Sequence, residues 1–456
     1  MVWSSSQGEP NVPQRAVRHH WRSSDGFIIS TMCLALFTDE LLFAFMVPLL
    51  PTILEDRIGL AASSTQRYTS IFLAEGAFVS VVSSPFIGSI ADATSSKKLL
   101  LLILLVLALV SVVCLSLTTT LSWLFIGRFF QSIASNALWI VGMVTMTENI
   151  GSEHMGKIAG LSSTMTAVGT TTGPVLAGIL FGLGGYWLAW AGAIGFLVVD
   201  IIMRLLMVER QHTSENEERD PLLNDSSESP STPNGIDSPE ASPVEIQGWR
   251  FYLCLFRQSR FAAGIFGYYV SALLIACFES TLAVHVRDAF GWGVLPVGLL
   301  MTSIQGPGMV LAPFVGWLRD RIGSRTPTTI GFIALIPFLF LLGIPGDDRF
   351  PWANEGSRGK VIYAVSMAML GCLMCMLGGV GTMEATETID LLETDNPGIF
   401  GPNGGYSRAI AITGMSFMAG LMTGPLLAGL LVEQLGYFEL QCVLGKSSPC
   451  LLPDVY

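Results

Sequence analysis

The chain has 456 residues, of which 51% are hydrophobic and only 13% are charged, and its mean hydropathy is +0.58. Soluble globular domains carry about a quarter of charged residues, so this composition excludes a soluble protein. The net charge of −11 indicates little about partners, because many of the acidic residues fall between 209 and 258. We expect a polytopic membrane protein in contact with the lipid bilayer, and we expect no nucleic-acid partner.

Long apolar stretches predict the membrane-spanning helices. The stretch 99–117 contains no charged residue and is long enough to cross a hydrocarbon core of about 30 Å as a helix. Taken in chain order, the same criterion predicts spans at 27–50, 68–90, 99–117, 122–146, 157–183, 186–207, 261–283, 295–318, 327–346, 361–383 and 408–431.

Two sequence patterns occur twice, which indicates two related halves. The first pattern, a Gly-Pro stretch with a glycine four residues before it, comprises Gly169, Gly173, Pro174 and Gly178 in one copy and Gly420, Gly424, Pro425 and Gly429 in the other. The second places a glycine four residues before an aspartate, at Gly88 and Asp92 and again at Gly316 and Asp320. Duplicated halves are how many secondary transporters build a site at the repeat interface.

The repeat and the hydrophilic segments divide the chain. We expect a tail at 1–25, a six-helix half at 26–208, a disordered acidic linker at 209–258, a second half at 259–437 and an atypical tail at 438–456. The last segment has only short apolar pieces broken by charges and prolines, so we expect the twelfth span to be truncated. Residues 1–25 show no apolar stretch followed by a cleavage site, so the first span serves as the insertion signal.

The Lys and Arg residues predict the orientation. They are more frequent in the N-terminal tail, in the linker and in the short loops on the same side as these segments than on the opposite side. The positive-inside rule therefore places the N-terminus and the linker in the cytosol.

The linker contains candidate regulatory signals. Glu218, Leu222 and Leu223 have the spacing of an acidic dileucine sorting signal that cytosolic adaptors read. Serine or threonine precedes proline at 229, 232, 238 and 242, a pattern that suits proline-directed kinases. A chance origin in an acidic, Ser/Pro-rich linker remains the alternative for both patterns.

Several motifs, taken in order, resemble one family. A loop motif between helices 2 and 3 is resembled by the stretch from Gly88 to Lys98, and a helix-4 motif by Arg128-Phe-Phe-Gln131. The stretch from Gly169 to Gly178 resembles a helix-5 antiporter motif. The first span, with Asp39 followed by Pro48 and Pro51, resembles the opening helix of the same proteins. The chain thus resembles the major facilitator superfamily over about residues 26–437, and specifically its drug:proton antiporter branch, which is similar to vesicular amine transporters. Ser95 and Gly414 depart from that pattern, Gly414 at a position where amine transporters have Asp or Asn.

Charged clusters near the cytoplasmic helix ends suit a gate. Such clusters latch two halves together and part when the halves rock. In the first half we expect Asp92, Lys97 and Lys98 to form the latch with Glu148. In the second half we expect Asp320, Arg321 and Arg325 to form it with Glu384.

Asp39 is the strongest candidate site residue, because it lies in the middle of an apolar span. An isolated charge there costs about 2.5–3.5 kcal/mol or more, so we expect Arg128 to act as its counter-ion. Glu75 and Glu279 lie in the outer halves of their spans and could face the same cavity, whereas Glu40 points about 100° away from Asp39. Gln131, Asn136 and Trp139 follow Arg128 and could contact a substrate, although Asn136 could equally bind a neighbouring helix.

These residues indicate a proton-coupled antiporter that exports a lipophilic organic compound, cationic or neutral, such as a drug or a secondary metabolite. Carboxylates outnumber cations in the inferred cavity, which disfavours an anion. The alternatives are a vacuolar or vesicular amine importer and a transport-inactive receptor. The sequence lacks phosphate-binding and catalytic motifs, so we expect that the protein is not an enzyme and needs no metal or organic cofactor. We expect a proton gradient to drive transport. We expect a location in the plasma membrane or in a vacuolar or vesicular membrane.

The orientation can be tested directly. In sealed membrane vesicles of known sidedness, protease added from the cytosolic side should cleave the linker 209–258 and leave the helices intact, because the charge bias places the linker on that side. A linker that is cleaved only after the vesicles are permeabilised would overturn the topology.

Overall fold

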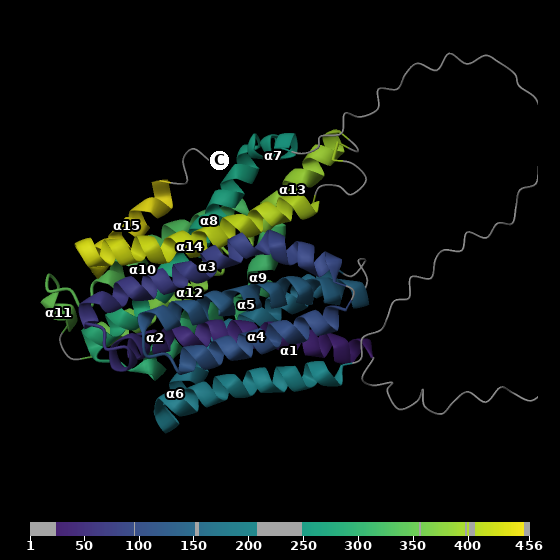
Figure 1. Cartoon of the computed structure of the whole chain (residues 1–456). Coiled ribbons are helices and arrows are strands. Elements are labelled where there is room, and N and C mark those ends of the chain that lie inside the picture. The colour runs from purple at the N-terminus through teal and green to yellow at the C-terminus, as the bar shows by residue number, and fades with distance from the viewer. Residues whose placement is uncertain are drawn as a thin grey trace, which may run out of the picture.

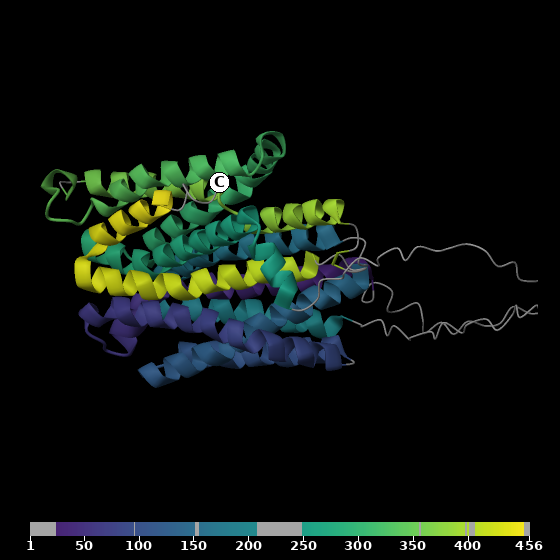
Figure 2. The ribbon, with the colours of Figure 1, turned by 90° about the horizontal axis from the view of Figure 1, so that it is seen from above.

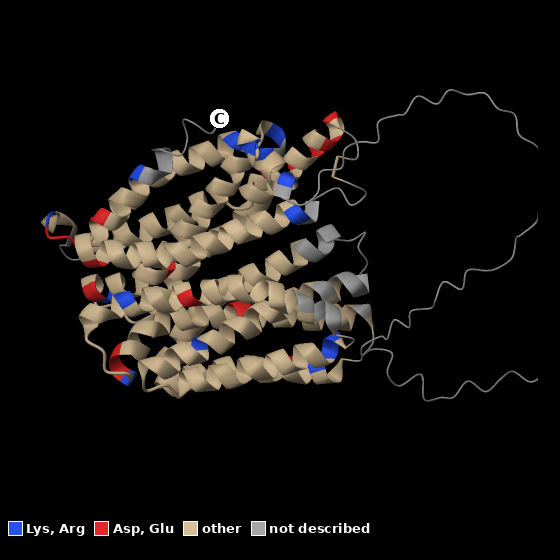
Figure 3. Ribbon diagram, turned by 45° about the horizontal axis from the view of Figure 1, so that its top comes forward, with Lys and Arg blue, Asp and Glu red and all other residues tan. Residues whose placement is uncertain are grey.

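The computed structural model describes residues 24–94, 96–150, 155–207, 249–354, 357–396, 399–400 and 406–450. Every long element in these ranges is a helix, and the helices run side by side in one elongated bundle (Figure 1). We call the end where α1 and α8 begin the linker end, and the other the opposite end. Most charged residues lie near these two ends, while the middle of the bundle is largely apolar (Figure 3).

The first half consists of α1 (Asp25–Met46), the 3-10 helix η2 (Val47–Leu49), α2 (Leu50–Thr52), the π-helix η3 (Ile53–Arg57), α3 (Ala62–Ala93), α4 (Lys97–Ser116), α5 (Leu121–Ile150) and α6 (Met155–Leu206). The second consists of α7 (Trp249–Phe256), α8 (Ser259–Phe290), α9 (Val294–Ile322), α10 (Arg325–Gly343), α11 (Pro351–Asn354), α12 (Arg358–Met374), α13 (Val380–Asp395), α14 (Tyr406–Leu435) and α15 (Tyr437–Cys450). Nine described helices are long and apolar enough to cross a membrane, which confirms the all-α polytopic fold.

Helix α6 contains two of the predicted spans. Its backbone leaves helical geometry at Gly184 and Gly185, where Gly185 has a φ of 68°. This left-handed conformation is one that glycine adopts at little cost. The break separates the predicted spans 157–183 and 186–207, and we call the two parts the first and second segments of α6.

The predicted single span 361–383 is wrong. Helix α12 ends at Met374, and α13 begins at Val380 after a turn in which Gly379 has a φ of 73°. The broken backbone leaves carbonyl groups without helical partners, and Arg319 of α9 donates to two of them, Gly378 O at 2.7 Å and Met376 O at 2.6 Å. Broken helices inside a membrane domain are stable where such groups are satisfied in this way.

The boundaries at the linker and at the C-terminal tail also differ from expectation. The linker was expected to be disordered up to 258, but Trp249–Phe256 forms α7, and Phe251 and Leu255 are buried against α8, α13 and α14. The tail forms the short helix α15, whose Leu440 and Leu444 are buried in the main core. Near it, outside the spans, Arg349 binds Glu439 at 2.6 Å and Asp347 at 2.6 Å, which holds the pKa of Asp347 below its usual value.

The repeated glycine motif packs identically in the two halves. In the first segment of α6, a Cβ at Gly169 would lie 2.6 Å from Phe37 O and one at Gly173 would lie 2.5 Å from Leu41 O, both on α1. In α14, Gly420 and Gly424 approach the backbone of α8 in the same way. The internal repeat of the sequence is therefore a structural repeat, in which the fifth helix of each half is seated on the first.

The last glycine of each motif contacts the other half. Gly178 lies against Leu295 of α9, and Gly429 lies against Ser70 of α3. The two halves are further joined by the Glu55–Arg287 ion pair and by hydrogen bonds from Gln66 Nε2 to Ser280 O (3.0 Å) and from Thr302 Oγ1 to Thr171 O (2.7 Å). All these contacts lie between the middle of the helices and the opposite end. Figure 2 shows the halves on either side, with α14 beside α3.

The seam can be tested by comparing two glycines of α6. Gly178→Ala should destabilise the protein by about 1–3 kcal/mol, because the added Cβ would lie 2.5 Å from the Leu295 backbone, which cannot move alone. Gly182→Ala is the matched control, since nothing lies within 4 Å of its Cβ position and alanine favours the helix. Thermal unfolding of the purified protein should show a lower midpoint for the first variant only. Equal midpoints would contradict the proposed close contact.

Candidate functional site

Arg128 of α5 lies at the centre of the candidate site. Its side chain is only 4% exposed, and the guanidinium donates to Gln131 Oε1 at 2.9 Å. It also lies over the rings of Phe43 and Phe72, at 5.1 and 5.0 Å from their centroids. The charge therefore lies inside the apolar bundle and not at its surface. An unbalanced cation inside such a bundle would be costly.

Asp39 of α1 accepts a hydrogen bond from Ser135 of α5 at 2.7 Å. The expected direct pair with Arg128 is not formed, because no ion pair within 4.0 Å joins the two in the described part of the chain. The two charges nevertheless interact at longer range. Ser135 was missed in the sequence, although it lies two helical turns from Arg128 on the same face of α5.

Glu75 and Glu279 face the same cation from two other helices. The charge of Arg128 interacts with Glu75 of α3 and with Glu279 of α8, as well as with Asp39. One oxygen of Glu75 is buried and has no hydrogen-bond partner among the described residues. Three carboxyl groups, two from the first half and one from the second, therefore lie within electrostatic range of one arginine.

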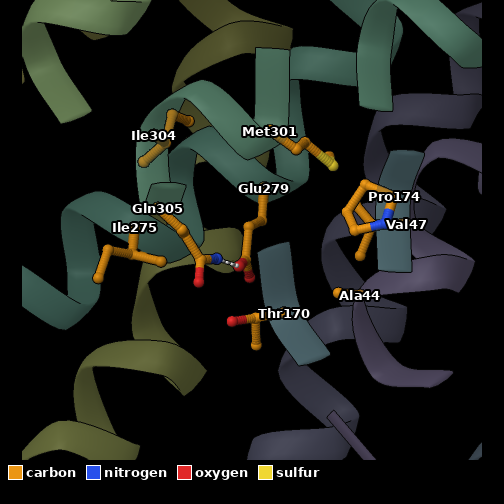
Figure 4. Close-up of a pocket in the computed structure, with 9 residues that line it drawn as sticks. All are labelled: Ala44, Val47, Thr170, Pro174, Ile275, Glu279, Met301, Ile304 and Gln305. Atoms are coloured by element: carbon orange, nitrogen blue, oxygen red, sulfur yellow. Dashed lines mark hydrogen bonds between the residues drawn. The ribbon is translucent and has the colours of Figure 1, made fainter. Parts of the chain in front are cut away.

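Glu279 also lines a small pocket between the two halves. The pocket is formed by Ala44, Val47, Thr170, Pro174, Ile275, Glu279, Met301, Ile304 and Gln305 (Figure 4). Gln305 Nε2 donates to Glu279 Oε1 at 3.2 Å. Gln305 was not predicted as a site residue. The one sequence signal for it is a polar side chain within an apolar span. The lining is mostly apolar with few polar groups, which is typical of sites for organic molecules.

Two further carboxyl groups belong to this region. Glu40 packs beside Gly169, and its charge interacts with Asp39 and Glu279, so it is closer to the site than its helical angle suggested. Asp200, in the second segment of α6, is fully buried, and its charge interacts with Asp39. The sequence signal for Asp200 was the same as for Asp39, a carboxylate inside an apolar span.

The remaining predicted cavity residues separate into two groups. Asn136 donates to Ser80 O at 2.9 Å and to the hydroxyl groups of Ser83 and Ser84 at 3.0 Å, so it binds the neighbouring helix α3. Trp139 is 46% exposed and lies on the Arg128 face of α5, towards the linker end. Its ring is therefore free for contacts, whereas Gln131 is occupied with Arg128.

At the linker end of the first half, the structure describes part of the expected latch. Lys98 donates to the carbonyl groups of Met207 and of Leu205, the latter at 3.4 Å, at the end of α6. Gly88 has no atom within 4 Å of its Cβ position. The side chains of Asp92 and Glu148 lie outside the described residues, and so do the sorting residues Glu218, Leu222 and Leu223.

The latch of the second half has different partners from those expected. Glu384 is bound by Arg260 of α8 at 3.2 Å and by Ser324, while Arg321 stacks on Trp317 at 4.4 Å. The expected pairing of Glu384 with Arg321 and Arg325 is therefore corrected to Arg260. The sequence missed this because Arg260 precedes Glu384 by more than a hundred residues, on a helix that only folding brings alongside. The side chain of Asp320 is not described, and Gly316 has open space around its Cβ position.

Comparison with known proteins adds the family relationship. The sequence pattern of the Major Facilitator Superfamily matches residues 32–388. The chain is 27% identical over 444 residues to an MFS-type transporter, ppzB, of Metarhizium rileyi, covering 91% of each chain. It is 23% identical to the tetracycline resistance protein, class B, of Escherichia coli, covering 73% of this chain and 74% of that protein.

Two solved structures share the fold. The nucleoside transporter NupG superposes with a TM-score of 0.62 at 13% sequence identity, covering 93% of this chain and 97% of that one. The human organic anion transporter MFSD10 superposes with a TM-score of 0.56 at 15% identity, covering 94% and 99%.

The setting of Arg128 can be tested with a double-mutant cycle. A Cβ at Gly76 of α3 would lie 2.5 Å from Arg128 Nη2. Because the guanidinium is buried and held by Gln131 and the rings of Phe43 and Phe72, it cannot easily move away, and Gly76→Ala should destabilise the wild type by about 1–3 kcal/mol through overpacking. In an Arg128→Ala background this cost should largely disappear, and thermal unfolding of the four proteins gives the coupling. Gly142→Ala, with nothing within 4 Å, should instead be additive with Arg128→Ala. Additive effects at Gly76 would refute the close approach.

Proposed function

This chain belongs to the Major Facilitator Superfamily of transporters, and on that premise we propose that it is a proton-coupled antiporter of a lipophilic organic compound. The observation that carries the proposal is the set of carboxyl groups around one buried arginine, Asp39, Glu75 and Glu279 around Arg128, at the contact of the two halves. Multi-pass transporters of this fold bind substrate and coupling ions between their repeats.

The chemistry of this cluster suits exchange. A buried carboxyl group favours its protonated form, and a nearby cation favours its ionised form, so the two influences together allow both proton binding and proton release. Protonation of Asp39 weakens its attraction to Arg128, while a cationic substrate competes with the proton for the same negative charge. Proton and substrate would therefore occupy the site in turn.

The charge balance of the site supports a cationic or neutral substrate. Three carboxyl groups face one guanidinium, and the pocket beside Glu279 is mostly apolar. A relative of this chain is a tetracycline resistance protein, which is consistent with an organic substrate such as a drug or secondary metabolite. Gly414 of α14 has no side chain at a position where amine transporters have Asp or Asn, so an amine importer is less favoured.

The proposed cycle uses the seam described above. The contacts between halves lie towards the opposite end, whereas the charged groups around Lys98 and Arg260 lie at the linker end. We propose that the linker end is cytosolic and that these groups part and re-form as the halves rock. The dileucine pattern and the Ser/Thr-Pro sites would then meet cytosolic adaptors and kinases, and the protein would act in the plasma membrane or a vacuolar membrane.

The proposal is tested by replacing Asp39. In proteoliposomes with an imposed pH gradient and labelled lipophilic amines as probes, Asp39→Asn should abolish uphill accumulation, because it keeps the size of the side chain but cannot release a proton. Asp39→Glu should keep part of it. Glu433→Gln, at an exposed carboxylate of α14, is the control and should transport like the wild type.

Two outcomes would change the assignment. Wild-type accumulation by a correctly inserted Asp39→Asn protein would remove Asp39 as the coupling group and transfer that role to Glu75 or Glu279. A wild-type protein that binds the probes but never accumulates them in either gradient direction would instead support the receptor alternative.

A further inference from the structure

Helix α7 lies on the outside of the bundle at the linker end and has no role in the site described so far (Figure 1). Its eight residues are too few to form a stable helix in water on their own, so the helix depends on what it packs against. Phe251 and Leu255, one helical turn apart, are buried against α8, α13 and α14. The ring of Phe251 lies 5.1 Å from that of Phe400, measured between centroids. One face of α7 is therefore fixed to the second half.

The opposite face of α7 is also apolar. Leu253 is 54% exposed and, at 100° per residue, points away from Phe251 and Leu255. On the flank between the two faces, Phe256 is 48% exposed and Tyr252 is 41% exposed. A helix that faced water would carry polar side chains on its outer side. The outer face of α7 therefore suits a partly apolar environment.

Two arginines border this outer face. Arg250 and Arg257 are both exposed and lie on the same side of α7 as Leu253. Arg257 N donates to Leu253 O at 3.0 Å, so Arg257 continues the last turn of the helix. Neither arginine forms an ion pair with a residue that the structure describes. Their positive charges are therefore directed outwards, beside an apolar surface.

The neighbouring arginines are bound within the protein. Arg260 of α8 binds Glu384 at 3.2 Å and Glu387 at 2.8 Å. Arg408 of α14 donates to Phe400 O at 3.2 Å and lies over a ring of α7. The other acidic residues of α13 follow Glu387 in the sequence, and α13 extends further towards the linker end than α7 (Figures 1 and 3). The two arginines of α7 thus differ from their neighbours in facing outwards.

The position of α7 indicates the kind of partner. Helix α7 packs on the first turns of α8 and α14, and both of these helices are candidate membrane spans that begin at this level. It therefore lies where the spans enter the bilayer, at the level of the lipid headgroups. A helix that presents apolar side chains together with arginines is typical of this interface, where acidic headgroups supply the opposite charge.

We propose that α7 is an interfacial anchor that binds acidic phospholipid headgroups of the surrounding bilayer. Leu253 and Phe256 enter the boundary between headgroups and acyl chains, while Arg250 and Arg257 bind the phosphate groups. The charge bias of the loops places this end in the cytosol, where the membrane leaflet carries acidic lipids. The anchor holds the start of the second half at the membrane surface, and it depends neither on the substrate nor on proton coupling.

The acidic segment 209–248 is the competing partner for the two arginines, because it precedes α7 in the chain and is rich in Asp and Glu. It contains few apolar residues that could cover Leu253 and Phe256. A lipid headgroup with its acyl chains matches both the charge and the apolar surface of α7. We therefore favour the bilayer, and the experiment below separates the two partners.

Hydrogen–deuterium exchange of the full chain in lipid nanodiscs tests the anchor. We compare discs of phosphatidylcholine alone with discs that also contain the acidic lipid phosphatidylglycerol. The amides of α7 should exchange about fivefold or more slowly in the acidic discs, since one arginine near an acidic surface contributes a factor of about five. Exchange reports this local stability directly, because a short peripheral helix opens independently of the core.

Matched variants assign the effect to α7. Arg250→Gln with Arg257→Gln should reduce the difference between the two kinds of disc to less than about twofold, because the charges that attract the headgroups are gone. Leu253→Ser with Phe256→Ser should also reduce it, through lost insertion. The control, Arg67→Gln with Arg358→Gln, removes two exposed arginines at the opposite end and should keep the full difference.

Four results would overturn the proposal. The first is equal exchange of α7 in both kinds of disc for the wild type, and the second is a full difference in the Arg250→Gln, Arg257→Gln variant. The third is slow exchange of α7 in phosphatidylcholine discs together with protection of 209–248, which would assign the surface to the acidic segment. The fourth is equal protection by soluble glycerol phosphate added to phosphatidylcholine discs, which would show a site for free phosphate.

Discussion

The structure depends on balancing the positive charge of one buried side chain, Arg128, with carboxyl groups of neighbouring helices. Arg128 lies within a bundle that exposes its apolar surface to lipid, so its charge must be balanced by groups of the protein. The balance comes from α1, α3 and α8 together, through Asp39, Glu75 and Glu279. Because Glu279 belongs to the second half, the same interaction links the two halves electrostatically. Any change in the protonation of one carboxyl group alters the balance for the others.

Close helix packing is what brings these groups together. Gly169 and Gly173 let the first segment of α6 approach the backbone of α1, and Gly76 leaves room on α3 for the guanidinium of Arg128. In a bilayer such small residues supply the close contacts that the hydrophobic effect provides in water. The glycine motif therefore contributes to function through geometry, by holding α1 and its Asp39 at a fixed distance from neighbouring helices.

The sequence predicted the framework well because its signals were local. Apolar stretches located the spans, the repeated glycines identified the two halves, and Gly184 and Gly185 marked the break within α6. Asp39 could be found because a carboxylate inside an apolar span is conspicuous. Asp200 carries the same signal, a carboxylate within an apolar span, but was not among the predicted site residues.

The errors arose where partners are distant in the chain. The Asp39–Ser135 and Glu384–Arg260 contacts join different helices, and no local spacing predicts which polar side chain will be nearest. The break between α12 and α13 was also not predicted, because a short turn with glycines differs little in hydropathy from a continuous helix. Its stability comes from Arg319, which supplies donors from another helix.

The two halves share their packing but not their charges. The glycine motif is repeated in α6 and α14 with equivalent contacts, whereas Arg128 and Asp39 belong to the first half alone and the second contributes Glu279 with Gln305. The open space around Gly414 in α14 fits this division, since no carboxylate stands there. A symmetric framework allows the halves to rock against each other about one seam. The asymmetric charge distribution places Asp39 and Glu75 on one side of that seam and Glu279 on the other. Under the proposed proton coupling, Glu279 is then the group that links the second half to Arg128.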